Sequence, residues 1–131
     1  MQSKYVISCD FMDIPRRAQA CWTLKDTECN GLLLLACTIA TKRPEGVYVC
    51  VDYIRYATFA SEECVPYFMQ YLLENLQGFA DFIEIPRRIF LLNPKLRLMG
   101  FVPTPDNPET AIYYMANRDK RPRLFFKELR K

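Results

Sequence analysis

The 131-residue chain contains no histidine, and this absence removes several classes of site at once. Serine and cysteine nucleophiles that depend on a histidine base are excluded. The six cysteines include no CxxC pair, which is the close spacing that all-cysteine zinc sites usually need. We therefore expect no bound metal and no catalytic triad.

Long apolar segments are also missing. The run Leu32–Ala36 is far too short to span a bilayer, and Asp10 and Asp13 interrupt the apolar stretch where a signal peptide would lie. The scattered cysteines indicate a reducing compartment rather than a disulfide framework. These features predict a soluble, cytoplasmic protein that does not contact a membrane.

Half of the residues are hydrophobic and 14% are aromatic, a composition that predicts one folded domain with its own core. The net charge of +3 is uneven, because Arg118–Lys131 carries seven basic residues and two acidic ones. We expect a domain over residues 1–117 and a basic tail over 118–131. The tail could bind nucleic acid or an acidic partner, and the alternative is a solvated segment anchored by Phe125 and Phe126.

Alternating and continuous apolar patterns predict most of the strands. The expected strands are Tyr5–Met12, Leu32–Thr41, Val47–Thr58, Phe79–Ile85, Phe101–Val102 and Thr110–Ala116. Ala20–Lys25 fits either a strand or a helical turn. In Val47–Thr58 we place Val49, Val51 and Tyr53 on one face and Cys50 and Ile54 on the other. Both faces are apolar, which predicts a central strand covered on both sides.

The main helix is expected after Ser61 and before Gly78. Its apolar positions recur at helical spacing, at Val65, Phe68, Met69, Leu72, Leu73 and Leu76. Pro66 belongs in a first turn, so the helix should begin nearer Glu63 or Cys64 than Ser61. A short helix, Pro94–Met99, should follow Asn93 as its N-cap and end at Gly100.

The order of these elements, together with Leu98-Met-Gly-Phe101, resembles the GNAT acyltransferase superfamily over about Ala20–Met115. The tetrapeptide is similar to the leucine-x-glycine-phenylalanine ending of that family's last helix. The resemblance implies an α/β (α+β) fold with a mixed, mostly antiparallel central sheet flanked by helices.

The resemblance also implies a cofactor, acetyl-CoA or another acyl-CoA. Its pyrophosphate would lie on backbone amides between the central strand and the main helix. The family loop reads Gln/Arg-x-x-Gly-x-Gly/Ala, and Arg55–Ala60 aligns with it, with Thr58 in place of the first glycine. Glu62 and Glu63 add negative charge there. The residues implied for cofactor binding are Tyr53, Ile54, Arg55, Thr58, Ala60 and Ser61.

The family's usual general acid is a tyrosine four residues before the glycine of the Gly-Phe pair. Leu96 holds that position here and cannot donate a proton. Asp52 and Glu84 are the carboxylates best placed on strands to act as a base, and the alternative for each is a paired structural charge. Tyr113 and Tyr114 are candidate acids, with core packing as their alternative role.

Two functions from different classes follow. The first is a divergent acyl-CoA-dependent N-acyltransferase that transfers an acetyl group to an amine. The second is a pseudoenzyme, a catalytically silent interaction or structural module with a protein partner. The chain also resembles small degenerate GNAT-like proteins of tailed phages, some of which are packaged as internal virion proteins, so host cytoplasm or virion would be its place. Nucleic-acid binding through Arg118–Lys131 is a third hypothesis.

Overall fold

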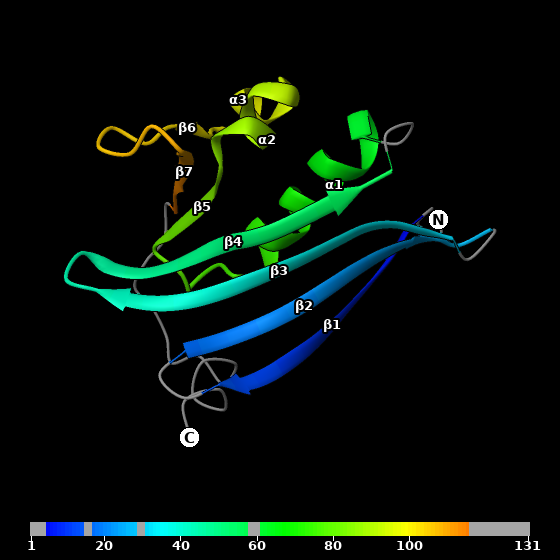
Figure 1. Cartoon of the computed structure of the whole chain (residues 1–131), viewed down its shortest axis with the longest axis horizontal. Helices are drawn as coiled ribbons and strands as arrows, with labels where there is room; N and C mark the ends of the chain where they lie inside the picture. Colours follow the sequence, from blue (N-terminus) through cyan, green and yellow to red (C-terminus); the bar gives the residue numbers. More distant parts are fainter. Residues whose placement is uncertain (1–4, 15–16, 29–30, 58–60, 116–131) are drawn as a thin grey trace.

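The computed structural model describes residues 5–14, 17–28, 31–57 and 61–115, with side chains except at 11–14, 17, 18, 61 and 62 (Figure 1). Four consecutive strands come first, and three helices and three more strands follow them. The strands are β1 (Tyr5–Ile14), β2 (Arg17–Asp26), β3 (Leu32–Arg43), β4 (Gly46–Tyr56), β5 (Phe82–Pro86), β6 (Val102–Pro103) and β7 (Thr110–Tyr114). The helices are α1 (Ser61–Asn75), α2 (Arg87–Leu92) and α3 (Lys95–Met99).

The described strands form one sheet in the order β1-β2-β3-β4-β5-β7-β6. Every neighbouring pair is antiparallel except β4 and β5, which are parallel and are joined through α1. A parallel pair needs such a crossover because the chain must return to the same end of the sheet. The predicted class, α+β with a mostly antiparallel sheet, is therefore confirmed, and β4 is central as expected.

Turn chemistry explains the first hairpins. The carboxylate of Asp26 accepts a hydrogen bond of 2.7 Å from the amide of Glu28, and the Asp26 amide donates to the Gly31 carbonyl at 3.0 Å. The next turn places Arg43 opposite Gly46 across two residues. Before the first of these turns, the segment Ala20–Lys25, which fitted either a strand or a helical turn, is part of β2.

The main core lies between the sheet and α1, which runs against β3 and β4 (Figure 1). All six apolar positions predicted on this helix are buried, namely Val65, Phe68, Met69, Leu72, Leu73 and Leu76. The predicted start of the helix is wrong, because α1 begins at Ser61 and holds Pro66 in its interior. Tertiary packing of the apolar stripe outweighs the hydrogen bond that proline cannot make.

A β-bulge in β4 corrects the predicted faces of this strand. Thr38 opposes Val51 but Cys37 opposes Tyr53, so Asp52 is an extra residue in β4. Ile54 therefore lies in the same core as Val51, with 3% of its surface exposed, and Tyr53 is 41% exposed. The prediction assumed unbroken alternation, which a single inserted residue reverses.

The helix α2 was not predicted, and it changes the role of Asn93. Its side-chain amide donates to the Ile89 carbonyl at 2.8 Å and so stabilises the end of α2. The N-cap of α3 is Pro94, and the prediction that Asn93 holds this position is wrong. Gly100 ends α3 as expected, with a positive φ of 118° that favours glycine, and the buried Phe101 follows.

The remaining expectations can be placed briefly. The strand expected over Phe79–Ile85 begins three residues later, at Phe82. The tail over residues 118–131 lies outside the described part of the chain. Among the helices of the described ranges, none has both the length and the apolar character needed to cross a bilayer.

Candidate functional site

The central feature of the site is the divergence of β4 and β5 (Figure 1). In the described chain their parallel ladder covers three residue pairs and ends with Cys50 opposite Glu84. Beyond that pair β5 continues against β7, whereas β4 continues against β3 to Tyr56. Among the described strands, the edge of β4 that faces β5 therefore has no partner over residues 51–56, and we call it the open edge of β4.

The bulge at Asp52 lies immediately after the last β4–β5 pair. A bulge bends its strand and increases the local twist. Its position, two residues beyond Cys50, therefore accounts for β4 turning away from β5 at this point. The exposed carboxylate of Asp52 lies at the same place.

The open edge leads directly into α1. The Ala57 amide still donates to the Leu33 carbonyl at 2.9 Å, and α1 begins four residues later at Ser61. At the start of this helix the exposed Glu63 accepts a 2.7 Å hydrogen bond from the hydroxyl of Tyr5 in β1. Burial and the Glu63 carboxylate raise the pKa of Tyr5 to about 12, so this hydroxyl stays protonated and donates.

Glu84 lies where β4 and β5 separate and is 9% exposed. Its Oε1 is 3.5 Å from the Arg43 guanidinium and accepts from the Cys50 thiol at 3.3 Å, while Oε2 accepts from the Thr110 hydroxyl at 3.4 Å. The Arg43 guanidinium also lies 3.9 Å from the centre of the Tyr48 ring. Of the two roles predicted for Glu84, this arrangement matches that of a paired charge.

The thiol of Cys50 is held in its protonated form. Burial is the largest cause, and the neighbouring Glu84 carboxylate adds to it, so that the pKa of Cys50 rises to about 12. The thiolate is the nucleophilic form of cysteine. Cys50 is consequently a poor nucleophile at neutral pH, even though an arginine lies close to it.

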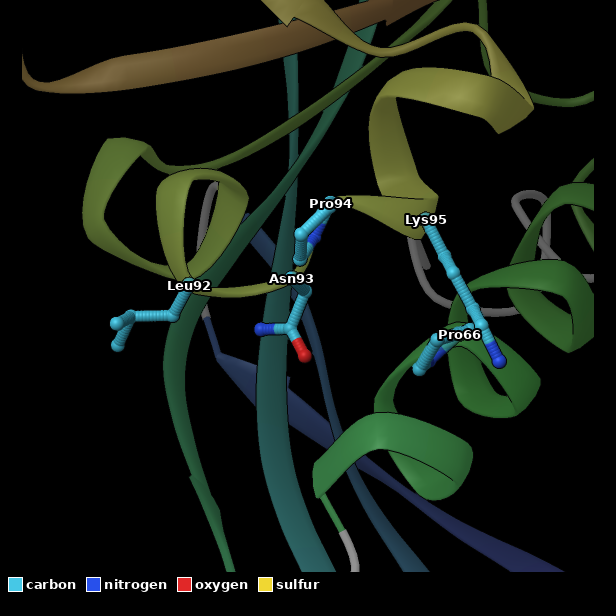
Figure 2. Close-up of a pocket in the computed structure, with 5 residues that line it drawn as sticks. All are labelled: Pro66, Leu92, Asn93, Pro94 and Lys95. Atoms are coloured by element: carbon cyan, nitrogen blue, oxygen red, sulfur yellow. The ribbon is translucent and has the colours of Figure 1, made fainter.

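A cavity of about 270 Å³ separates α1 from the link between α2 and α3 (Figure 2). It is lined by Pro66, Leu92, Asn93, Pro94 and Lys95. Lys95 extends from the start of α3 toward Pro66, and Leu92 points to the opposite side. The volume is at the lower end of the range of about 300–1,000 Å³ that is usual for small-molecule sites. The Lys95 ammonium group and the mostly apolar walls suit a small, largely apolar ligand that has a negatively charged group at one end.

A second, shallower hollow of about 300 Å³ lies over the start of β3 and the end of β4. Two predicted cofactor residues, Tyr53 and Arg55, line it, and both side chains are exposed. Ile54, which was also predicted to bind the cofactor, is buried in the core and offers a ligand only its backbone. Thr58 and Ala60 lie outside the described residues, as does the side chain of Ser61.

The two candidate acids, Tyr113 and Tyr114, are neighbours in β7 and contact different rings, and Leu96 holds the position of the family's usual acid. Leu96 is fully buried, and Tyr113 packs on Phe101 with ring centres 5.3 Å apart. Tyr114 is 53% exposed and contacts Phe82. The core-packing role predicted as the alternative for Tyr113 fits these contacts.

Sequence reasoning missed the residues that surround the predicted ones. Arg43, Cys50 and Thr110 contact Glu84, and Lys95 lines the cavity. The first three come from three separate strands, so no local spacing links them. The Asn-Pro step at 93–94 was the one local signal for the cavity, because proline prevents a continuous helix there.

Among the residues that the structure describes, no group of three or more cysteines or carboxylates is arranged to hold a metal ion. No protein-family model matches the chain, and no curated protein matches it in sequence.

Proposed function

We propose that this chain is a divergent, GNAT-like acyl-CoA-dependent N-acyltransferase. The observation that carries the proposal is the parting of β4 from β5 beyond Cys50 and Glu84, with α1 following the open strand. The sheet supports it as well, because it is mixed and mostly antiparallel, as the resemblance implies, and its parallel pair of β4 and β5 is joined through α1.

The open edge of β4 suits the arm of coenzyme A. That arm contains two amide groups, which can pair with unpaired strand amides as an added strand would. The pyrophosphate would then lie near the start of α1, where free helix amides and the dipole favour an anion. The thioester would come to the point where the two strands separate.

The chemistry is direct attack of an amine on the thioester carbonyl. The carbon–nitrogen bond forms, the carbon–sulfur bond breaks, and the sulfur leaves as the coenzyme thiolate, which takes up a proton. Holding the two reactants together supplies most of the acceleration. Because Leu96 cannot protonate the thiolate, the rate should be roughly 10²–10⁴-fold below that of an enzyme with a general acid. The exposed Asp52 is the remaining candidate for accepting the amine proton.

Calorimetry with acetyl-CoA tests this proposal directly. We expect measurable heat and a rise in Tm at millimolar ligand, because a ligand that binds only the folded state stabilises it. The Glu63→Gln variant removes a negative charge from the start of α1 and keeps the oxygen that accepts from Tyr5. It should bind acetyl-CoA about two- to fivefold more tightly at low salt, which corresponds to about 0.4–1 kcal/mol.

The matched control is Glu74→Gln, which removes a charge that is also exposed from the last turn of the same helix. It should leave the affinity unchanged. No heat and no thermal shift with the unmodified protein would end the proposal. Equal effects of the two variants would place the pyrophosphate away from the start of α1.

A catalytically silent interaction module is the second candidate, and the buried Leu96 and the tied carboxylate of Glu84 favour it. Both features remove groups that would move protons, and neither blocks the open edge of β4. A product assay with acetyl-CoA and a panel of primary amines separates the two candidates. Binding without acetylated product supports the silent module, and turnover above the rate without protein supports the enzyme.

A further inference from the structure

Two cysteines lie directly opposite each other on neighbouring antiparallel strands. Cys21 of β2 is paired in register with Cys37 of β3. Their sulfur atoms are 3.4 Å apart, and one thiol donates a hydrogen bond to the other. Neither residue is fully buried, so a small reagent in solvent has access to the pair.

The backbone at this position already meets the requirements of a disulfide. Residues opposite each other in an antiparallel ladder have Cα atoms about 4.5–5.5 Å apart. Disulfides span Cα separations of about 4.4–6.8 Å. Joining the two sulfurs therefore requires small side-chain rotations and no movement of one strand past the other.

The other described cysteines have different surroundings. Cys9 opposes Trp22, so its side chain lies on the opposite face of the sheet and packs against the core. Cys64 is fully buried in α1, and Cys50 donates to the Glu84 carboxylate. Among the described residues, Cys21 and Cys37 are thus the pair whose sulfurs are in contact and partly exposed.

We propose that Cys21 and Cys37 form a redox-active dithiol that a low-molecular-weight disulfide such as oxidised glutathione converts to a cross-strand disulfide. One protein thiolate attacks the small disulfide, forms a mixed disulfide and releases one small thiol. The second protein thiolate then attacks the mixed disulfide and releases the other. Two protein thiols are oxidised, one small disulfide is reduced to two thiols, and both protons go to these products.

The local electrostatics set the rate of this exchange. Burial, the hydrogen bond with Cys21 and the nearby charge of Asp52 raise the pKa of Cys37 to about 11. Little of the Cys37 thiolate is then present at neutral pH, so attack by Cys37 should be slow at pH 7 and faster at pH 9. The proposal does not rest on acyl-CoA binding. It does touch that site, because Cys37 opposes Tyr53 beside the bulge.

The test is made on the full chain with Cys29→Ser as background, because trypsin leaves residues 29 and 37 in one peptide, 26–42. The protein is equilibrated with glutathione mixtures of graded ratio, blocked with N-ethylmaleimide, digested and examined by mass spectrometry. We expect a disulfide between peptides 18–25 and 26–42 that dithiothreitol reverses. The crosslink should raise Tm by about 5–10 °C, because it closes a loop of 16 residues.

Cys50→Ser is the matched control and should retain the crosslink, whereas Cys21→Ser and Cys37→Ser should lose it and the rise in Tm. Three results would overturn the proposal. These are mixed disulfides with glutathione alone, peptides joined in no preferred pairing, and fully reduced thiols in excess oxidised glutathione at pH 9.

Discussion

The partners of the Glu84 carboxylate bear directly on whether this residue can act as a base. A carboxylate that is 9% exposed needs several donors, because leaving a buried charge without partners is costly. Arg43, Cys50 and Thr110 supply them from three strands. A general base must change its partners during the reaction. The contacts that stabilise Glu84 where β4 and β5 separate therefore already occupy both of the oxygens that a general base would use.

The Arg43→Met variant tests this role of Glu84 in stability. It removes the cation and leaves the carboxylate with two neutral donors, so we expect a loss of about 1–3 kcal/mol in the free energy of unfolding. The value is below that of a fully buried pair because the Arg43 side chain is 38% exposed. Urea unfolding of the variant measures the loss.

Two further variants complete the comparison. Arg88→Met removes an exposed arginine from α2 and should change stability by less than about 0.5 kcal/mol. Adding Glu84→Gln to Arg43→Met should recover part of the loss, because no uncompensated charge remains. A loss in Arg43→Met no larger than that in Arg88→Met would show that the ion pair contributes little.

Among the elements, β4 is the one in which a single residue changes the geometry most. Its bulge lies at Asp52, between the last pair with β5 and the open edge. Deleting Asp52 leaves Val51 opposite Thr38 and Tyr53 opposite Cys37, so every other side chain keeps its face. The deletion therefore removes the bend of the strand while preserving the core.

We expect the Asp52 deletion to fold and to lose at least tenfold in acetyl-CoA affinity. A straight β4 would continue beside β5 and close the edge that we propose for the coenzyme arm. Asp52→Asn is the paired variant, since it keeps the bulge and removes only the carboxylate. It should bind normally and, if Asp52 accepts the amine proton, should be slower in turnover. Unchanged affinity in the deletion would refute the role assigned to the bulge, and calorimetry measures both variants.

The elements also show which features the sequence could predict. The strands and the buried face of α1 were predictable, because six apolar residues at helical spacing have one stable arrangement against a sheet. The bulge was not, since one inserted residue leaves no mark in the apolar pattern. The helix start was wrong because Pro66 is tolerated inside α1, where packing of the helix outweighs one lost hydrogen bond.

The site was predictable only in part, for a related reason. Asp52, Tyr53, Arg55 and Glu84 could be named from the sequence because they lie on the predicted strands that the structure shows as β4 and β5, and their roles stay predictions. Their partners come from distant strands, and Lys95 comes from a helix that begins after a proline. Long-range neighbours depend on sheet order, and sheet order was inferred from a resemblance rather than from local patterns.

At the scale of the whole molecule, the two faces of the sheet differ in character. The face toward α1 carries the continuous apolar core. On the other face, the ring of Phe82 contacts those of Tyr48 and Tyr114 beside the charged pair of Arg43 and Glu84. Thiols lie on both faces of the sheet. Because burial raises the pKa values of several of them, the stability of the fold depends on whether these thiols are protonated.

That linkage predicts a loss of stability at alkaline pH. The pKa values of four thiols are raised, those of Cys9, Cys37 and Cys64 to about 11 and that of Cys50 to about 12. In the unfolded chain thiols titrate near pH 9, so above that pH the unfolded state holds fewer protons and stability falls as pH rises. The contribution is complete below about pH 9 and is lost through pH 11–12.

Tm should be flat from pH 6 to 8 and fall from pH 8.5 to 10.5. In the Cys50→Ala variant, Tm should fall less steeply over this range. In terms of the free energy of unfolding, the slopes of the two proteins should differ by up to about 1.4 kcal/mol per pH unit. A Tm independent of pH to 10.5, or equal slopes for the two proteins, would contradict this account.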